Sequence, residues 1–231
     1  MAHLPVYLAA TAKPRFPDPR TADAEGLLAV GGEISPVWLR AAYSAGIFPW
    51  FDERVPPLWW SPDPRAVITD SGLHVARRLG RTLRSGRFRA TWNTDFAAVM
   101  RACGENRDDG TWITGEMLDG YAALHAEGGA HSVEVWCGDH LVGGAYGVHV
   151  GGVFCAESMF HRQTDASKVA LVTLARRLFA AGVELLEVQF MTPHLRRLGA
   201  VEMSRRAYLA RLRALRTQAV DLGAAGPVPL G

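Results

Sequence analysis

Three polar side chains interrupt apolar stretches in the second half of the chain. Glu157 lies between Ala156 and the pair Met159-Phe160, in a segment that we predict to be a strand. A carboxylate in such surroundings is costly unless a cation pairs with it, either inside the protein or on a bound molecule. Glu187 and Gln189 stand two residues apart in a last apolar strand, so we expect them to share a face. They either act on a bound group or form an internally bonded or solvated polar pair.

A run of positive charge follows the first quarter of the chain. Between residues 77 and 89 there are six arginines and no acid: Arg77, Arg78, Arg81, Arg84, Arg87 and Arg89. A helix would place Arg77, Arg81 and Arg84 on one face, because they are spaced by four and three residues. Such a face either binds the phosphates of a nucleic acid or is simply solvated. Phosphate contacts would give an affinity that depends on salt but not on the nucleotide sequence.

Several other kinds of site are not predicted. The eight histidines include no H-E-x-x-H pattern, and the three cysteines (Cys103, Cys137 and Cys155) lack C-x-x-C spacing. We therefore expect no metal, no disulfide framework and no cofactor. No convincing Ser-His-Asp or Cys-His set is found. No apolar run reaches about 18 residues, and the first residues do not resemble a secretory signal. We expect a cytoplasmic protein that does not enter a membrane, and a monomer.

Turn residues and periodicity predict the elements that position these side chains. Ser35-Pro36 begins a helix that ends at Gly46, and Thr114 caps another helix. The prolines around Trp59-Trp60 predict an extended segment, with a domain boundary near residue 63. Further helices are expected over 73–83, 94–103, 115–127, 166–181 and 205–218, and strands over 88–92, 132–136, 141–150, 153–159 and 185–190. The Ala/Gly/Pro tail is expected to fray.

These elements predict an α/β protein of the α+β type. A small N-terminal domain would cover residues 1–63 and contribute to the substrate site. A larger domain, over residues 64–231, would contain a mixed, mostly antiparallel sheet. The order of hairpin strands, helix, strand and helix resembles the GNAT acyltransferase fold, which by itself does not define a reaction.

Longer strings of residues make a more specific resemblance. The chain resembles the leucyl/phenylalanyl-tRNA–protein transferases over about residues 25–210. The matching stretches include Gly46-Ile47-Phe48-Pro49-Trp50, Leu58-Trp59-Trp60-Ser61-Pro62-Asp63-Pro64-Arg65, Gly110-Thr111-Trp112-Ile113-Thr114, Phe154-Cys155-Ala156-Glu157-Ser158-Met159-Phe160 and Asp165-Ala166-Ser167-Lys168. The resemblance implies transfer of Leu or Phe, and less readily Met, from aminoacyl-tRNA to the N-terminal α-amine of proteins that begin with Arg or Lys. Such tagging marks a protein for degradation in an N-degron pathway.

The resemblance also implies roles for single residues. Trp50 and Trp112 would flank the terminal adenine of the tRNA, Glu157 would bind the basic side chain of the acceptor, and Tyr121 would support Glu157. Gln189 would lie near the attacking amine and Glu187 would polarise it, or both would only orient substrates. The arginine run would bind the tRNA backbone. Lys168 either contacts the 3′ end of the tRNA or is a solvated surface lysine.

An apolar pocket is implied for the transferred side chain, lined by Ala145, Phe154, Leu171, Leu174 and Leu186. Ala145 and Leu174 stand where the family has the bulkier Met and Phe, and Glu187 stands where its best-known member has Asp. The order of preference among Leu, Phe and Met therefore stays open. Without the resemblance, the pattern of these five residues, of Tyr121 and of the two tryptophans is more typical of an ordinary core.

Two alternatives remain on the sequence alone. A GNAT enzyme that uses coenzyme A normally needs a glycine-containing loop before its central helix, because backbone N–H groups hold the pyrophosphate. Here residues 162–168 contain no glycine and carry Asp165, which argues against that cofactor. A tRNA-binding module without catalysis is the other alternative. It would leave the acid at Glu157 unexplained.

Overall fold

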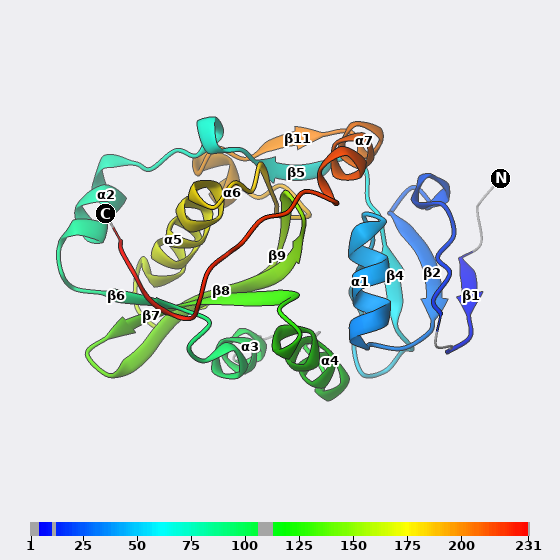
Figure 1. Ribbon diagram of the computed structural model, residues 1–231, viewed down its shortest axis with the longest axis horizontal. Coiled ribbons are helices and arrows are strands. Elements are labelled where there is room, and N and C mark those ends of the chain that lie inside the picture. The colour runs from blue at the N-terminus through cyan, green and yellow to red at the C-terminus, as the bar shows by residue number, and fades with distance from the viewer. Residues whose placement is uncertain (1–4, 11–12, 106–112, 231) are drawn as a thin grey trace.

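A computed structural model describes residues 5–10, 13–105 and 113–230 of the chain (Figure 1). A four-stranded sheet lies at one end of the molecule, with strands β1 (Val6–Leu8), β2 (Leu27–Gly31), β4 (Leu58–Trp60) and β3 (Phe48–Pro49) in that order. Helix α1 (Pro36–Ser44) covers this sheet on the side that faces the rest of the protein. The extended segment predicted around Trp59-Trp60 is therefore confirmed as strand β4.

A second, eight-stranded sheet forms the body of the molecule. Its strands follow the order β11 (Val201–Met203), β5 (Arg65–Ile68), β10 (Leu185–Glu187), β9 (Val153–His161), β8 (His140–Val150), β7 (Ala130–Cys137), β6 (Arg89–Trp92) and β12 (Gly226–Val228). β9 and β10 are parallel, and the other neighbours in this sheet are antiparallel. The predicted mixed, mostly antiparallel sheet is confirmed.

Helices cover both faces of the larger sheet (Figure 1). α5 (Ala166–Ala180) lies on one face, and α3 (Phe96–Gly104) and α4 (Gly115–Ala126) lie on the other. Successive residues of β8 accordingly belong to different hydrophobic clusters: Ala145 packs on the α5 side and Tyr146 on the α3 and α4 side. The remaining helices are α2 (Arg77–Arg84), α6 (Pro193–Arg197) and α7 (Arg205–Leu215), with 3-10 turns at Pro19–Thr21 and Asp70–Gly72. Among the described residues, no helix is long and apolar enough to span a bilayer.

The helix ends show which local signals were informative. Thr114 caps α4 as predicted, since its Oγ1 accepts a hydrogen bond of 3.2 Å from the Met117 N–H. Ser35 precedes α1, and Pro36 occupies the first turn, but the Ser35 hydroxyl donates to Glu33 and makes no capping bond. The helix predicted over 73–83 starts only at Arg77, because the Asp70–Gly72 turn and an extended connection come first.

The C-terminal tail does not fray as predicted. Residues 226–228 form strand β12, which pairs with β6 at the edge of the larger sheet. Arg177 donates to the Leu222 carbonyl at 2.5 Å and Arg176 donates to the Leu230 carbonyl at 2.9 Å. Two arginines of α5 thus hold a segment whose composition alone predicts disorder, because they satisfy backbone groups that would otherwise be left to water.

One hydrophobic cluster joins the two sheets. It contains Trp38 and Trp59 from the N-terminal part together with Tyr121 and Tyr208 from the larger part. The chain passes from one sheet to the other between Trp60 and Arg65, close to the predicted boundary at residue 63. Because the core is shared, residues 1–63 as a domain in its own right remain a prediction.

Candidate active site

A β-bulge places Glu157. Tyr146 of β8 pairs with Ser158 of β9, but the next residue, Gly147, pairs with Ala156, so Glu157 is the extra residue in its strand. Bulges re-aim side chains, and they are common beside active sites. Gly147 is required opposite this bulge, because a Cβ there would collide with the Cys155 carbonyl oxygen and the Phe154 ring. The local backbone therefore turns a carboxylate out of the regular alternation of the strand.

Gln189 contacts Glu157 just beyond the end of the parallel pairing between β9 and β10. The register between β9 and β10 ends at the pair Cys155 and Glu187. Beyond it, the Gln189 Nε2 donates a hydrogen bond of 3.2 Å to the Glu157 Oε1. Gln189 has φ 54°, in the left-handed region, so the predicted strand over 185–190 stops at Glu187. The prediction that Glu187 and Gln189 share a strand face is wrong, because this backbone conformation breaks the two-residue alternation.

Two tyrosines complete the surroundings of Glu157. The Tyr121 hydroxyl donates to the Glu157 Oε2 at 3.4 Å, and the Tyr121 and Tyr43 hydroxyl oxygens lie 2.5 Å apart. Glu157 keeps some exposed surface, but protein atoms enclose its carboxyl group. This burial raises the pKa of Glu157 to about 8, although hydrogen bonding by the tyrosines opposes the shift. The site thus contains a carboxyl group that is poised to ionise when a cation arrives.

Glu187 lies deeper than Glu157. Its side chain is 0% exposed, and its Oε1 accepts hydrogen bonds from the Arg65 Nε at 3.1 Å and from the Gln189 backbone N–H at 2.6 Å. The structure therefore links Glu187 to the backbone of Gln189, one strand away from Glu157. Arg65 was not singled out as a functional residue from the sequence, although it ends the most specific matching string.

Two exposed aromatic rings lie close together, and one of them belongs to Phe190, which directly follows Gln189. Trp50 is 45% exposed and Phe190 is 42% exposed, and their ring centroids are 6.0 Å apart. Trp60 packs against Trp50 at 5.8 Å and donates its Nε1–H to the Trp50 carbonyl. Trp112, the other predicted stacking residue, lies outside the described residues. Phe190 was missed because it was expected to be part of a buried strand.

The five residues predicted to line the aminoacyl pocket are all buried. Ala145, Phe154, Leu171, Leu174 and Leu186 belong to one hydrophobic cluster between α5 and the sheet, each at most 3% exposed. The structure brings them together, but as packed core residues. Their role toward a substrate side chain remains a prediction.

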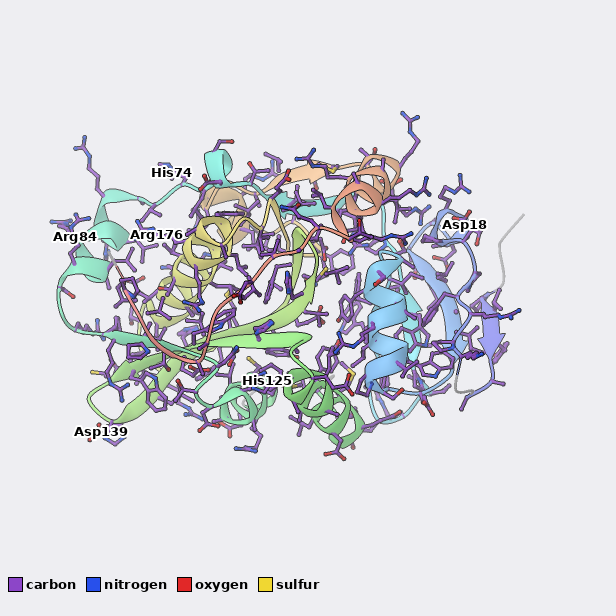
Figure 2. The ribbon with its side chains drawn as sticks, in the orientation of Figure 1. Asp18, His74, Arg84, His125, Asp139 and Arg176 are labelled. Atoms are coloured by element: carbon purple, nitrogen blue, oxygen red, sulfur yellow. The ribbon has the colours of Figure 1, made fainter. Side chains whose placement is uncertain are left out.

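The predicted basic surface lies at the end of the molecule opposite the four-stranded sheet (Figures 1 and 2). All six arginines between residues 77 and 89 are exposed, and α2 lies far from α1 along the longest axis. Arg87 donates to the Gln163 side chain at 3.0 Å, and Arg89 lies 4.0 Å from Asp139. Lys168 forms an ion pair of 2.7 Å with Asp165 at the start of α5.

Asp165 connects Lys168 to the arginine run. The pKa of Asp165 is lowered, mainly because its carboxylate accepts a hydrogen bond from Lys168. The charges of Arg78 and Arg87 act in the same direction. Lys168 and α2 therefore contribute to one positively charged region. Its exposed charges suit a polyanion whose backbone is contacted from outside.

Comparisons with known proteins identify one family over most of the chain. The model of the leucyl/phenylalanyl-tRNA protein transferase family matches residues 67–213, and that of its N-terminal domain matches residues 32–63. A leucyl/phenylalanyl-tRNA–protein transferase from Solidesulfovibrio magneticus is 51% identical over 218 residues, covering 93% of this chain and 88% of its own. One from Anaeromyxobacter sp. is 53% identical over 224 residues, covering 93% and 96%.

A more distant relative and one solved structure were also found. The transferase from Proteus mirabilis is 49% identical over 199 residues, covering 85% of this chain and 86% of its own. A GCN5-related N-acetyltransferase from Kribbella flavida is similar in structure, with a TM-score of 0.42 and 12% identity over 70% of this chain and 58% of its own. On the sequence matches, this chain belongs to the leucyl/phenylalanyl-tRNA–protein transferases, a family of aminoacyltransferases.

Proposed function

We propose that this chain transfers Leu or Phe, and Met less readily, from aminoacyl-tRNA to the N-terminal α-amine of proteins that begin with Arg or Lys. The observation that carries the proposal is the enclosed carboxyl group of Glu157, a half-buried residue, which accepts hydrogen bonds from Tyr121 and Gln189. A carboxylate there matches a guanidinium or ammonium group. The tagged protein would then enter an N-degron pathway.

The reaction requires little acid–base assistance. The α-amine has a reference pKa of about 7.7–8.0, so a substantial share is neutral near pH 7.5. Its nitrogen attacks the carbonyl carbon of the aminoacyl ester, a C–N bond forms, and the bond from that carbon to the ribose oxygen breaks. The amine loses a proton and the ribose oxygen gains one. Placing the amine against the ester is the main task for the protein, because positioning removes most of the entropic barrier.

The other predicted residues fit around this centre. Trp50 offers an exposed ring 6.0 Å from that of Phe190, the residue after Gln189, which suits stacking of the terminal adenine. The cluster that contains Phe154 and Leu174 would accept the transferred side chain when the region between α5 and the sheet opens. The arginines of α2 and Lys168 would bind phosphates of the tRNA. Gln189 would orient the attacking amine.

The compartment follows from the same proposal. Charged tRNA is a cytoplasmic substrate, and Cys103, Cys137 and Cys155 are free thiols, as expected where disulfides are kept reduced. We therefore place the activity in the cytoplasm.

The direct test is transfer of labelled leucine from Leu-tRNA to a peptide that begins with Arg. The same peptide beginning with Gly, and an N-acetylated Arg peptide, are the controls. Label on the free Arg peptide alone is the expected result. Absence of transfer with Leu, Phe and Met on the tRNA would refute the proposal.

A further inference from the structure

Arg65 is a fully buried cation with partners in three different parts of the fold. Its side chain is 1% exposed. The Nε and Nη2 each lie 3.1 Å from the Glu187 Oε1, and the Nη1 donates to the Gly46 carbonyl at 2.8 Å. The guanidinium carbon lies 4.4 Å from the centre of the Tyr208 ring. A buried charge needs this degree of pairing, because removal from water is otherwise very unfavourable.

Glu187, which Arg65 holds in place, binds the backbone of Gln189. The same Oε1 that binds Arg65 accepts the Gln189 backbone N–H at 2.6 Å. On the other side of the residue, the Gln189 carbonyl accepts the Ala66 N–H at 3.0 Å. These two bonds hold Gln189 in its left-handed conformation, which is unusual for a residue other than glycine. With that backbone fixed, the side-chain amide reaches Glu157.

Direct contact between Glu187 and a substrate does not fit this geometry. The side chain is wholly enclosed, and its Oε1 already accepts hydrogen bonds from the Arg65 Nε and the Gln189 N–H and lies 3.1 Å from the Arg65 Nη2. The Oε2 is also buried, and no described protein group donates to it. An acceptor amine would have to replace buried protein contacts to reach either oxygen.

We propose that Arg65 and Glu187 are positioning residues, which act on the reaction by fixing the backbone of Gln189 so that its side chain faces Glu157 and the acceptor. Glu187 then takes no proton from the amine. This inference rests on the proposed function for the identity of the acceptor, but the coupling from Arg65 to Gln189 is testable without transfer.

A double replacement separates positioning from stability. In Arg65→Met/Glu187→Leu, apolar side chains of similar size replace the ion pair, a change that often leaves stability unaltered or higher. We expect a melting temperature close to that of the wild type. We also expect at least a tenfold lower kcat/KM for an Arg-starting peptide, caused mainly by a higher KM for the peptide, with unchanged affinity for aminoacyl-tRNA. An ion pair that only stabilised the fold would leave kcat/KM near the wild-type value.

Two further variants keep the test decisive. Arg65→Lys retains the charge but not the forked geometry, so it serves if the double variant does not fold, and it should lower kcat/KM in the same direction. The exposed pair Arg211 and Glu184, 2.5 Å apart, provides the control Arg211→Met/Glu184→Leu, which should change neither kinetic constant.

Hydrogen exchange at the Gln189 amide gives a readout that does not depend on activity. This amide should exchange at least tenfold faster in Arg65→Met/Glu187→Leu than in the wild type, while the amide of Leu186 is unchanged. Unaltered exchange at Gln189, or wild-type kcat/KM in a folded variant, would overturn the proposal. If the wild type transferred nothing to any peptide, the proposed function would fail, and the exchange rates alone would decide whether Arg65 and Glu187 fix Gln189.

Discussion

The two charged regions of the molecule are built in opposite ways. Around Glu157, a few polar side chains are buried or half-buried and bind one another: Tyr121, Gln189 and, one step further, Glu187 with Arg65. On α2, the arginines are exposed. Burial makes the first region selective, since an unmatched group there loses hydration without compensation. Exposure makes the second region tolerant, because each charge contributes little and is screened by salt.

In the proposed reaction, this contrast would divide recognition between the two substrates. The acceptor would present one cation, which a buried carboxyl group suits. A tRNA backbone presents many equivalent phosphates, which a row of long, exposed arginines suits. Loss of one group should therefore be severe in the first region and mild in the second.

The largest effect is expected for Glu157→Gln. Loss of a hydrogen bond to a charged group weakens binding by about 1.5–3 kcal/mol, which is roughly 10- to 150-fold in kcat/KM for an Arg-starting peptide. Initial rates with limiting peptide measure it. Glu134→Gln is the matched control, because Glu134 is also buried, is bound by Thr91 and Ser132, and lies on β7, which β8 separates from β9. Equal kcat/KM in Glu157→Gln and the wild type would remove Glu157 from acceptor recognition.

Unfolding measurements test whether Glu157→Gln loses activity only because the variant is less stable. The pKa of Glu157 is raised in the folded protein, so the folded state retains a proton that the unfolded chain releases above about pH 4.5. Stability from this group is present below that pH and is lost as the pH rises through about 8. Glu157→Gln should therefore be at least as stable as the wild type at pH 8.5 in urea unfolding.

The pH dependence of acceptor binding should be nearly as large. Below about pH 8 the Glu157 carboxyl group is protonated, so a cation must first displace that proton. The inhibition constant of an N-acetylated Arg peptide, which has no titratable α-amine, should fall by up to about tenfold per pH unit between pH 6.5 and 8. It should level off above pH 8. The Glu157→Gln enzyme should show a flat profile, and a flat wild-type profile would contradict the account.

A smaller effect is expected when three arginines of the exposed region are removed. Arg77, Arg81 and Arg84 changed together to Ala should weaken binding of charged tRNA by about tenfold at low salt, because each exposed contact contributes less than about 1 kcal/mol. The slope of log affinity against log salt should decrease by up to about 2.7. The control replaces Arg101, Arg206 and Arg213, which are exposed on α3 and α7. An unaltered slope would locate the tRNA site elsewhere.

The smallest change is expected for Trp50→Ala. Stacking of a base contributes about 1–3 kcal/mol, and the neighbouring rings of Trp60 and Phe190 remain, so a loss of about fivefold in affinity for aminoacyl-tRNA is expected. The loss should persist with a short aminoacylated fragment that ends in adenosine, which does not reach α2. A loss confined to full-length tRNA would assign Trp50 to another part of the nucleic acid.

The sequence predicted regular features of the site better than irregular ones. Thr114 and the helix it caps were predictable, since a capping residue and apolar periodicity act within a few residues. Glu157 and Gln189 were identified by their chemistry. Their arrangement was not, because a bulge moves Glu157 and a left-handed residue turns Gln189 away from the strand. Such breaks depend on neighbouring strands, which a local pattern does not include.

Long-range partners were the other feature beyond prediction. Arg65 and Glu187 are 122 residues apart in sequence, and no spacing rule connects them. The C-terminal tail has a composition typical of disorder, yet it is held by Arg176 and Arg177. In both cases an arginine side chain bonds to a segment far away in the sequence, and patterns of neighbouring residues do not predict such a pairing.

Discrimination between arginine and its neutral analogue shows whether Glu157 recognises the charge of the acceptor side chain. Citrulline has nearly the shape of arginine but no charge, so the ratio of kcat/KM for Arg- and citrulline-starting peptides isolates recognition of the cation. We expect a ratio above about 10 for the wild type and a ratio near 1 for Glu157→Gln. The same ratio in both proteins would contradict the claim that the buried carboxyl group of Glu157 selects the acceptor.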